Sequence, residues 1–594
     1  MSDYLKSSRI KACPRWVRGL DALVALGFVV LLYRGVYGRT PGAQPSEFAG
    51  SVDMSPLDQL AVQHAGRIKS FDSHARSEMQ FINGMNEIDG QGHSFTYLDL
   101  LFRPQTYQNR PTVYVKKKLI RKRVAQALDG SHALPPATRE SFMETGLIAP
   151  AWLFLPAVET LLDEMERNVM RGQKEARAIR DARFLATQTG ILGQKLKIIP
   201  PPVGDESAVW HSVDELGLAG MPRDNAHAGV APRHGIPNLD SETEAKLSAA
   251  WNGLREGWQN EDASAVNAAI AELSTLVVAV NPEIYPDIER LRWESWYFRH
   301  KGLTWGWVFY LLAVVPLLMA LIYRWRWAHI AGMVVFVLAF ALHTSTLGLR
   351  WYISQRWPNS NMFEAVTTAA WFGGVGALLL ELWVRRRPLR GLFALASAGA
   401  SMTAMMCTYF LPVQLSSNVS NMMPILADVW LYIHTNVIIF SYCLIFMGGL
   451  TGLCYLRYRL GGGDPGVAKA GGAGTLIMDT GGAGGFLRSD KATVGQILDA
   501  GTMVLMELAF ILLWTGLVMG AIWADHSWGR PWGWDPKEVF ALCTFLIFLI
   551  LVHVRFKVRD KGLWTAVLAV VGCAVMLFNW IVINFVISGL HSYA

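Results

Sequence analysis

The chain has 594 residues, of which 52% are hydrophobic and only 17% are charged, well below the roughly 25% of charged residues in soluble proteins. Many apolar runs reach about 20 residues, the length of a helix that crosses a bilayer, and this excludes a single soluble domain. The net charge of +7 does not indicate nucleic-acid binding, because basic residues of membrane proteins concentrate in cytoplasmic loops. The six cysteines form no C-x-x-C pair, so the sequence predicts no thiol redox motif, no zinc site and no covalently bound haem.

The first 39 residues combine a basic N-terminal stretch with an apolar run from Leu20 to Tyr33. Cleaved signal peptides have the same pattern, but no A-x-A-like cleavage site follows the run, and Arg34 and Arg39 come next. We therefore interpret residues 1–39 as a cytoplasmic segment followed by an uncleaved membrane anchor.

Residues 40–300 are polar and contain clusters of proline and glycine. Helical periodicity runs through residues 141–183 and 241–278. The sequence predicts a mostly helical extramembrane domain that is large enough to form its own core. Docking of a substrate protein, docking of a membrane partner and scaffolding all fit such a domain. Its histidines, His64 and His74 among them, show no metal-ligand spacing and are expected to be structural.

Residues 301–594 are almost entirely apolar and predict eight further spans. They lie near 303–323, 328–347, 362–384, 391–411, 431–456, 498–523, 539–557 and 563–588. Basic residues gather in alternate loops, which places the N-terminus and these loops in the cytoplasm. The domain at 40–300, the remaining loops and the C-terminus are then expected on the outer (periplasmic) face. The predicted fold class is mainly α, a polytopic helical membrane protein with about nine spans and a mostly helical N-terminal extramembrane domain.

The outer loop at 524–538 contains three tryptophans within seven residues. They form either an interfacial aromatic belt or a platform for a large planar ligand. The glycines and prolines between them favour a platform, because belts consist of scattered single aromatic residues. The platform comprises Trp528, Trp532, Trp534 and Asp535.

The end of this loop also carries the signals of a helix start. Asp535 is a suitable N-cap, Pro536 suits the first helical position, and Glu538 stands three residues after the cap. This order predicts a capping box at the beginning of the next helix.

The string W-G-R-P-W-G-W-D-P-K-E at 528–538 resembles the WWD segment of haem-handling cytochrome c assembly proteins, and it is most similar to the CcsA family. The segment at 343–364, W-L-Y-I-H at 430–434 and G-L-H-S-Y at 589–593 resemble further stretches of that family. The resemblance covers residues 300–594. It implies that the protein binds haem b, transports it across the inner (cytoplasmic) membrane and attaches it to apocytochrome c through thioether bonds at C-x-x-C-H, as part of a holocytochrome c synthase (haem lyase).

Four histidines are candidate axial ligands of the haem iron. The predicted topology brings His434 and His591 to the membrane face that carries the tryptophan loop, and the resemblance implies that these two hold external haem. The resemblance also implies that His553, near the inner face, holds haem within the membrane, although such a histidine could instead reach for cytoplasmic water. The partner of His553 is either His329, which lies at a comparable depth, or a residue of another chain.

Two arginines, Arg350 and Arg530, are predicted in outer loops, where a guanidinium either pairs with a haem propionate or stays solvated. The resemblance further implies three classes of partner: apocytochrome c, a membrane protein of the CcsB (ResB) type and thiol-reducing proteins. The chain departs from the fused CcsB–CcsA form, because one anchor and an extramembrane domain stand where several CcsB spans would be.

Two other functions remain as alternatives. A membrane haem-b electron-transfer subunit of a quinol-oxidising complex would also place histidines at two depths, but electron transfer needs no exposed tryptophan platform. A secondary transporter would show broken helices and inverted repeats. The sequence shows no convincing internal repeat, and Glu381 and Glu507 are its few intramembrane acids.

Overall fold

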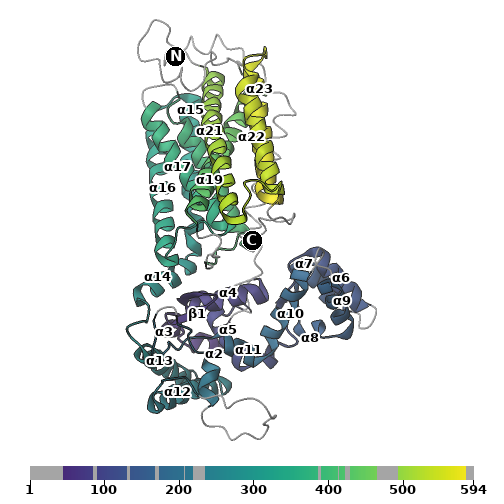
Figure 1. The fold of residues 1–594 in the computed structure, drawn as a ribbon, viewed down its shortest axis with the longest axis vertical. Coiled ribbons are helices and arrows are strands. Elements are labelled where there is room, and N and C mark those ends of the chain that lie inside the picture. Colours follow the sequence, from purple (N-terminus) through teal and green to yellow (C-terminus); the bar gives the residue numbers. More distant parts are fainter. Residues whose placement is uncertain are drawn as a thin grey trace. The chain divides into compact units, whose positions relative to one another are not determined.

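The computed structural model describes most of the chain, and its helices dominate (Figure 1). The described residues are 45–84, 88, 90–129, 134–167, 173–205, 208–218, 235–384, 389–412, 414–419, 421, 428–463 and 493–583. The chain divides into two compact units, one of residues Thr40–Arg299 and one of residues Met1–Arg39 with His300–Ala594. The predicted anchor at 1–39 lies outside the described residues.

The unit Thr40–Arg299 consists of short helices and two small antiparallel hairpins, β1–β2 and β3–β4. Its elements are α2 (Glu47–Ser51), α3 (Ser55–Asp58), β1 (Ala61–His64), β2 (Arg67–Ser70), α4 (Phe71–Asn83), α5 (His93–Phe102), η1 (Pro104–Tyr107), β3 (Val113–Tyr114), α6 (Lys118–Asp129), α7 (Pro136–Thr145), β4 (Leu147–Ile148), α8 (Pro150–Leu153), α9 (Pro156–Arg167), α10 (Gln173–Thr187), α11 (Thr189–Lys195), η2 (Val213–Leu218), α12 (Ser241–Gln259), α13 (Ala263–Val280) and α14 (Ile288–Arg299). Trp258 of α12 is completely buried against the rings of Phe48 and Phe95 and anchors the core of this unit.

Helix α13 is long and apolar enough to cross a membrane by length and composition. One of its faces is nevertheless completely buried in the core of the unit Thr40–Arg299, and it packs against α12. The residues of this face are Val266, Ile270, Leu273 and Val277. Their spacing of three and four residues is that of a helix that faces a protein core, so we assign α13 to this unit.

The β1–β2 hairpin is closed by a tight turn at Ala65 and Gly66, which have φ angles of 51° and 74°. Two consecutive positive φ angles are typical of the hairpin turn that matches the twist of the flanking strands. The register pairs His64 with Arg67. Ser70 ends β2 and caps α4, because its side chain accepts a hydrogen bond from the amide of Ser73. The hairpin therefore leads directly into α4.

The unit that contains residues 300–594 is a bundle of long helices (Figure 1). They are α15 (Trp307–Tyr323), preceded by η3 (Lys301–Gly306), α16 (Arg326–Ser354), α17 (Met362–Val384), α18 (Leu392–Phe410), α19 (Val429–Leu460), α21 (Val494–Trp528), α22 (Pro536–Val554) and α23 (Lys561–Phe578), which continues into η5 (Asn579–Ile583). Within the described residues, nine helices could cross a membrane, and eight of them are these. The prediction of a polytopic helical membrane protein is confirmed.

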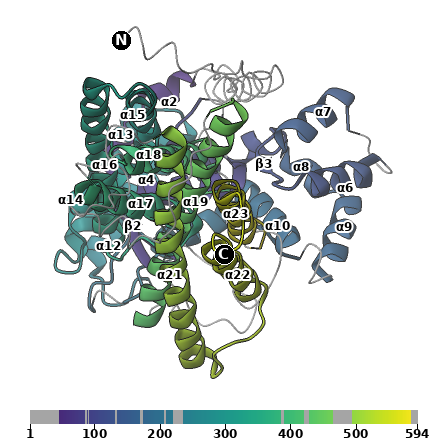
Figure 2. The ribbon, with the colours of Figure 1, turned by 90° about the horizontal axis from the view of Figure 1, so that it is seen from above.

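Helix α19 packs against four helices of the bundle, α17, α18, α21 and α23, and lies among them in the view of Figure 2. Small residues allow this close packing. Gly452 of α19 lies so close to α23 that a Cβ atom on it would be 3.1 Å from the carbonyl oxygen of Ala566, and a Cβ on Gly449 would be 2.8 Å from Cβ of Cys573.

Candidate functional site

The tryptophan loop is shorter than the predicted 524–538, because α21 continues to Trp528 and ends at Gly529, which has a φ of 68°. Trp528 packs edge-on against Trp523 of α21 with a centroid distance of 4.8 Å. Trp532 and Trp534 form a second pair with a centroid distance of 6.0 Å and an interplanar angle of 83°. Trp534 is 73% exposed, so it offers an indole face to a ligand.

The predicted helix start after the loop is confirmed. Asp535 accepts a hydrogen bond from the amide of Lys537, and Glu538 accepts one from the amide of Asp535 at 3.1 Å. Glu538 also accepts a bond from the amide of Gly533 at 2.8 Å, which ties the loop to α22. The carboxylate of Asp535 is buried in this cap, so it holds the shape of the platform and does not extend its surface.

His434 stands in the second turn of α19 and lies against the backbone of α21. Its Nδ1 donates a hydrogen bond to the carbonyl oxygen of Gly516 at 2.7 Å. This bond selects the tautomer whose lone pair is on Nε2, the form in which imidazole binds a metal. A Cβ atom on Gly520 would lie 2.6 Å from Cε1 of His434, so the ring fits only because residue 520 is glycine.

The helices α19 and α21 run antiparallel at this end. Trp430 of α19 faces His526 of α21 with a centroid distance of 6.5 Å, and one turn further along α19 His434 faces Gly520. His434 thus lies about two turns from the end of α21 at which the tryptophan loop begins. His591 lies outside the described residues.

The other two candidate ligands are on separate groups of helices. His553 is exposed near the end of α22, and its Nδ1 donates to the carbonyl oxygen of Leu549 at 2.7 Å, which again leaves the lone pair on Nε2. His329 is half-buried near the start of α16, beside Gly391. In the described part of the chain α16 packs on α15, α17 and α18, whereas α22 packs on α21 and α23. The structure therefore gives no support to His329 as the partner of His553.

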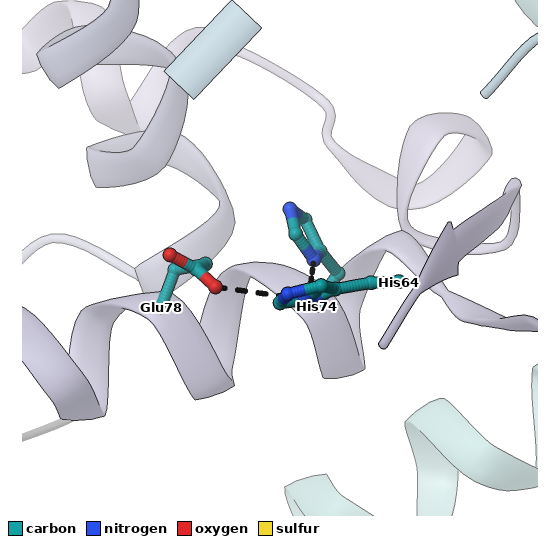
Figure 3. A group of neighbouring side chains, drawn as sticks. All are labelled: His64, His74 and Glu78. Atoms are coloured by element: carbon teal, nitrogen blue, oxygen red, sulfur yellow. Dashed lines mark hydrogen bonds and ion pairs between the residues drawn. The ribbon is translucent and has the colours of Figure 1, made fainter. Parts of the chain in front are cut away.

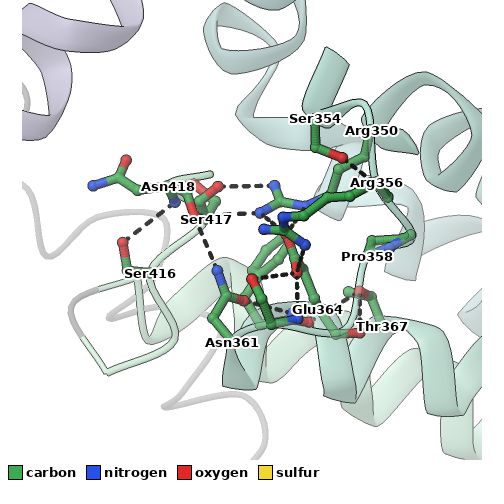
Figure 4. A network of polar contacts seen from close by, with 12 residues as sticks. Arg350, Ser354, Arg356, Pro358, Asn361, Glu364, Thr367, Ser416, Ser417 and Asn418 are labelled. Atoms are coloured by element: carbon green, nitrogen blue, oxygen red, sulfur yellow. Dashed lines mark hydrogen bonds and ion pairs between the residues drawn. The ribbon is translucent and has the colours of Figure 1, made fainter. Parts of the chain in front are cut away.

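The expectation that Arg350 is an exposed loop residue is wrong, because α16 continues to Ser354 and buries it. Its Nε and Nη2 both donate to one carboxylate oxygen of Glu364, at 2.9 and 2.8 Å, and Nη1 donates to the carbonyl oxygen of Ser417 at 2.8 Å (Figure 4). Arg356 donates to the other oxygen of Glu364 at 2.9 Å. Arg350 is engaged in this network, whereas Arg530 is exposed in the tryptophan loop.

Two groups of residues close to His434 were not predicted from the sequence. Trp357 donates its indole N–H to Asn436 at 3.0 Å, which ties the segment after α16 to α19 close to His434. Gly516 and Gly520 form a G-x-x-x-G pair that brings α21 close to α19. This spacing in an apolar helix is a known packing signal and could have identified them.

Comparison with known proteins identifies relatives of this chain. The family model for cytochrome c assembly proteins matches residues 359–591, which include His434, His553 and the tryptophan loop. The chain is 32% identical over 305 residues to the cytochrome c biogenesis protein CcsA of Parasynechococcus marenigrum, an alignment that covers 49% of this chain and 95% of that protein. It is 32% identical to the CcsA protein of Synechococcus sp. (strain CC9605), with 44% and 87% covered, and 29% identical to that of Pyropia yezoensis, with 45% and 87% covered. The chain therefore belongs to the CcsA family of membrane proteins with a role in cytochrome c maturation.

Proposed function

We propose that this protein carries haem b to the outer face of the inner membrane, holds it there and presents it to apocytochrome c for covalent attachment. The observation that carries the proposal is the hydrogen bond of 2.7 Å from Nδ1 of His434 to Gly516. It prepares the ring as an iron ligand near the helix end from which an exposed tryptophan loop extends. A resident electron-transfer haem would not need the exposed face of Trp534.

Each residue of the site has one task in this proposal. His434 and His591 bind the iron from its two sides, and Trp528, Trp532 and Trp534 lie against the macrocycle. Arg530 pairs with a propionate, since guanidinium matches carboxylate geometry.

Haem reaches this site from an earlier one near the inner face, where His553 binds the iron. Because His329 lies on a different group of helices, we propose that a CcsB-like membrane partner supplies the second ligand of His553.

Covalent attachment requires that the haem is held in position and that the cysteine thiols of the apocytochrome are reduced. Each cysteine thiol of a C-x-x-C-H segment adds across one vinyl group of the haem substrate: the sulfur bonds to one vinyl carbon and the thiol proton goes to the other. Atoms and electrons balance without an oxidant. The role of this chain is to hold the vinyl groups where the thiols arrive, and thiol-reducing proteins keep the two cysteines from forming a disulfide.

Absorption spectra of the full chain, purified from haem-replete membranes, test this proposal. We expect a bis-histidine haem spectrum that His434→Gly and His591→Gly each weaken and that added imidazole restores. His526→Gly is the matched control, because this exposed histidine is near the same end of α21 but is not a proposed ligand. A colourless protein, or a spectrum that neither ligand substitution changes, would contradict the proposal.

A second measurement separates haem presentation from electron transfer. The haem-loaded protein is mixed with a reduced peptide that contains C-x-x-C-H. Transfer of haem to the peptide as a covalent adduct is expected, whereas haem that stays on the protein would favour an electron-transfer subunit.

A further inference from the structure

Three side chains of the unit Thr40–Arg299 converge in a way that their sequence positions do not indicate (Figure 3). His64 is the last residue of β1, and His74 and Glu78 lie one turn apart on α4. One ligand atom from each lies within 4.8 Å of the other two. The spacing of four residues on α4 puts two ligands on one helix face, and the β1–β2 hairpin adds the third.

The hydrogen bonds around His74 define which of its nitrogens can bind a metal. The hydroxyl of Tyr97 donates its one proton to the carbonyl oxygen of Leu192 at 3.0 Å. It must therefore accept the hydrogen bond of 3.2 Å that joins it to Nε2 of His74. Nε2 consequently carries the proton of a neutral ring, and the lone pair is on Nδ1, which faces Nδ1 of His64 at 3.2 Å.

This separation is that of two ligands of one small metal ion. Two nitrogens that each lie about 2.0–2.1 Å from a tetrahedral zinc ion are roughly 3.3 Å apart. Glu78 Oε1 lies 3.7 Å from Nδ1 of His64. A small side-chain rotation would bring these two atoms to the separation of two ligands of one zinc ion. His74 and Glu78 are buried, while the side chain of His64 is 27% exposed and leaves one side open to solvent.

The surrounding charges act on the site in two ways. Burial and the nearby Lys69, Lys195 and Lys197 lower the pKa of His64 to about 4, and burial also lowers the pKa of His74. The lysines repel a cation, but Lys195 also donates to Oε2 of Glu78 at 2.9 Å and so holds the carboxylate with Oε1 toward the histidines.

We propose that His64, His74 and Glu78 form a zinc site that joins the β1–β2 hairpin to α4, with the fourth coordination position open to water beside His64. Two imidazoles and one carboxylate are a common ligand set for zinc. Tyr97 is a positioning residue, since it selects the tautomer of His74. The site uses none of the residues of the proposed haem function.

Zinc titration of the full chain in detergent tests the proposal. The protein is first freed of metal with a chelator and then titrated with zinc in competition with a chromophoric chelator. We expect one site in the wild type that His64→Ala and Glu78→Gln both abolish. Tyr97→Phe keeps the ring but removes the acceptor of His74, and we expect zinc binding to weaken about 10- to 100-fold. Cobalt(II) in place of zinc should give the intense visible absorption of a tetrahedral N/O site.

His211→Ala is the control for histidines in general, because His211 is paired with Glu215 in the same unit and is not a proposed ligand. This variant should keep the zinc stoichiometry of the wild type. Equal zinc binding by the wild type and Glu78→Gln, a substitution that preserves shape, would overturn the proposal even if His64→Ala fails to fold. The haem spectrum of Glu78→Gln should stay unchanged, so failure of the zinc site and failure of the haem function are distinguishable.

Discussion

At the scale of single residues, the site around His434 depends on the backbone of the neighbouring helix. The carbonyl oxygen of Gly516 selects the tautomer, and the missing side chain of Gly520 provides the space for the ring. A carbonyl within a helix already accepts a bond from the amide four residues later, so His434 shares this acceptor. The ring of His434 is therefore oriented by a backbone carbonyl and by close packing rather than by a carboxylate.

Replacement of Gly520 by alanine should impair haem binding without unfolding the helix. The new Cβ would lie 2.6 Å from Cε1 and 2.8 Å from Nδ1 of His434, so the ring must move and its bond to Gly516 must lengthen. Because alanine favours a helix over glycine by about 0.5–1 kcal/mol, a loss of stability is not expected from the backbone. We expect haem affinity to fall about 10- to 100-fold, measured by haem titration. Gly348→Ala is the control, since nothing lies within 4 Å of its added Cβ; equal affinities for both variants would contradict the role of Gly520.

The sequence predicted the positions and contacts of some residues correctly and those of others wrongly. The cap formed by Asp535 and Glu538 was predicted correctly because all its partners lie within six residues. The exposure predicted for Arg350 was wrong, because hydropathy marks where an apolar run ends and not where the helix ends. The contact of His64 with α4 needs a hairpin turn whose register the sequence alone does not show.

At the scale of elements, the network around Glu364 fastens the start of α17 to the end of α16. Glu364 is fully buried and receives Arg350 on one oxygen and Arg356 on the other. The amide of Ser360 also donates to it at 2.8 Å. The segment between the two helices is thereby held next to α19, where Trp357 bonds to Asn436.

Removal of the central carboxylate should strongly destabilise this part of the bundle. Glu364→Ala leaves the guanidinium of Arg350, which is 1% exposed, buried without its carboxylate. Loss of one partner of a buried ion pair typically costs about 3–5 kcal/mol. We expect a marked fall in the temperature at which the detergent-solubilised protein loses its monodisperse elution profile.

Glu364→Gln keeps the shape and several hydrogen bonds of the network, so its effect should be smaller than that of Glu364→Ala. Glu242→Ala on α12 removes an exposed pair with Lys246 and should change little. If Glu364→Ala behaves like Glu242→Ala, the network does not stabilise the bundle.

The spans were predicted because about 20 apolar residues are needed to cross a bilayer, whatever their packing. The ends of the helices were not predicted correctly. The helix predicted at 498–523 runs from Val494 to Trp528, because the capping box of Thr493 and Gln496 starts it earlier and Gly529 ends it later. These polar and glycine signals lie outside the apolar window.

At the scale of the whole molecule, the chain divides into two compact units. The family match covers residues 359–591 only, and the unit Thr40–Arg299 has a hydrophobic core of its own. Its buried ionisable groups make its stability depend on pH. Burial and neighbouring lysines lower the pKa of His64 to about 4, whereas burial and the nearby Asp72 raise the pKa of Asp58 to about 6.

The two shifts have opposite signs. Between pH 6.5 and 4 the unfolded chain protonates His64 and the folded unit does not, so stability falls as the pH falls through this range. Over pH 6 to 4 the folded unit protonates Asp58 more readily than the unfolded chain, which stabilises it as the pH falls. The pKa of buried His74 is lowered like that of His64. Burial also raises the pKa of Asp214, which acts in the same direction as Asp58. Because the pKa of His74 is lowered well below its ordinary value and His64 adds to it, the net expectation is a loss of stability on acidification.

Hydrogen exchange of the full chain at pH 7 and pH 5, in the presence of a chelator and corrected for intrinsic exchange rates, measures this loss. The free energy of opening of β1, β2 and α4, measured by their protection from exchange, should fall at pH 5. The contribution of His64 alone is on the order of 1–2 kcal/mol, because its ring is partly exposed and solvent screens its pKa shift. His64→Gln should reduce the fall, since glutamine does not titrate. Asp58→Asn should enlarge it, since it removes a group that gains a proton on folding in this pH range. Peptides of α12 are the internal reference, and protection of α4 that rises between pH 7 and pH 5 would show that Asp58, not the histidines, controls the acid stability of the unit.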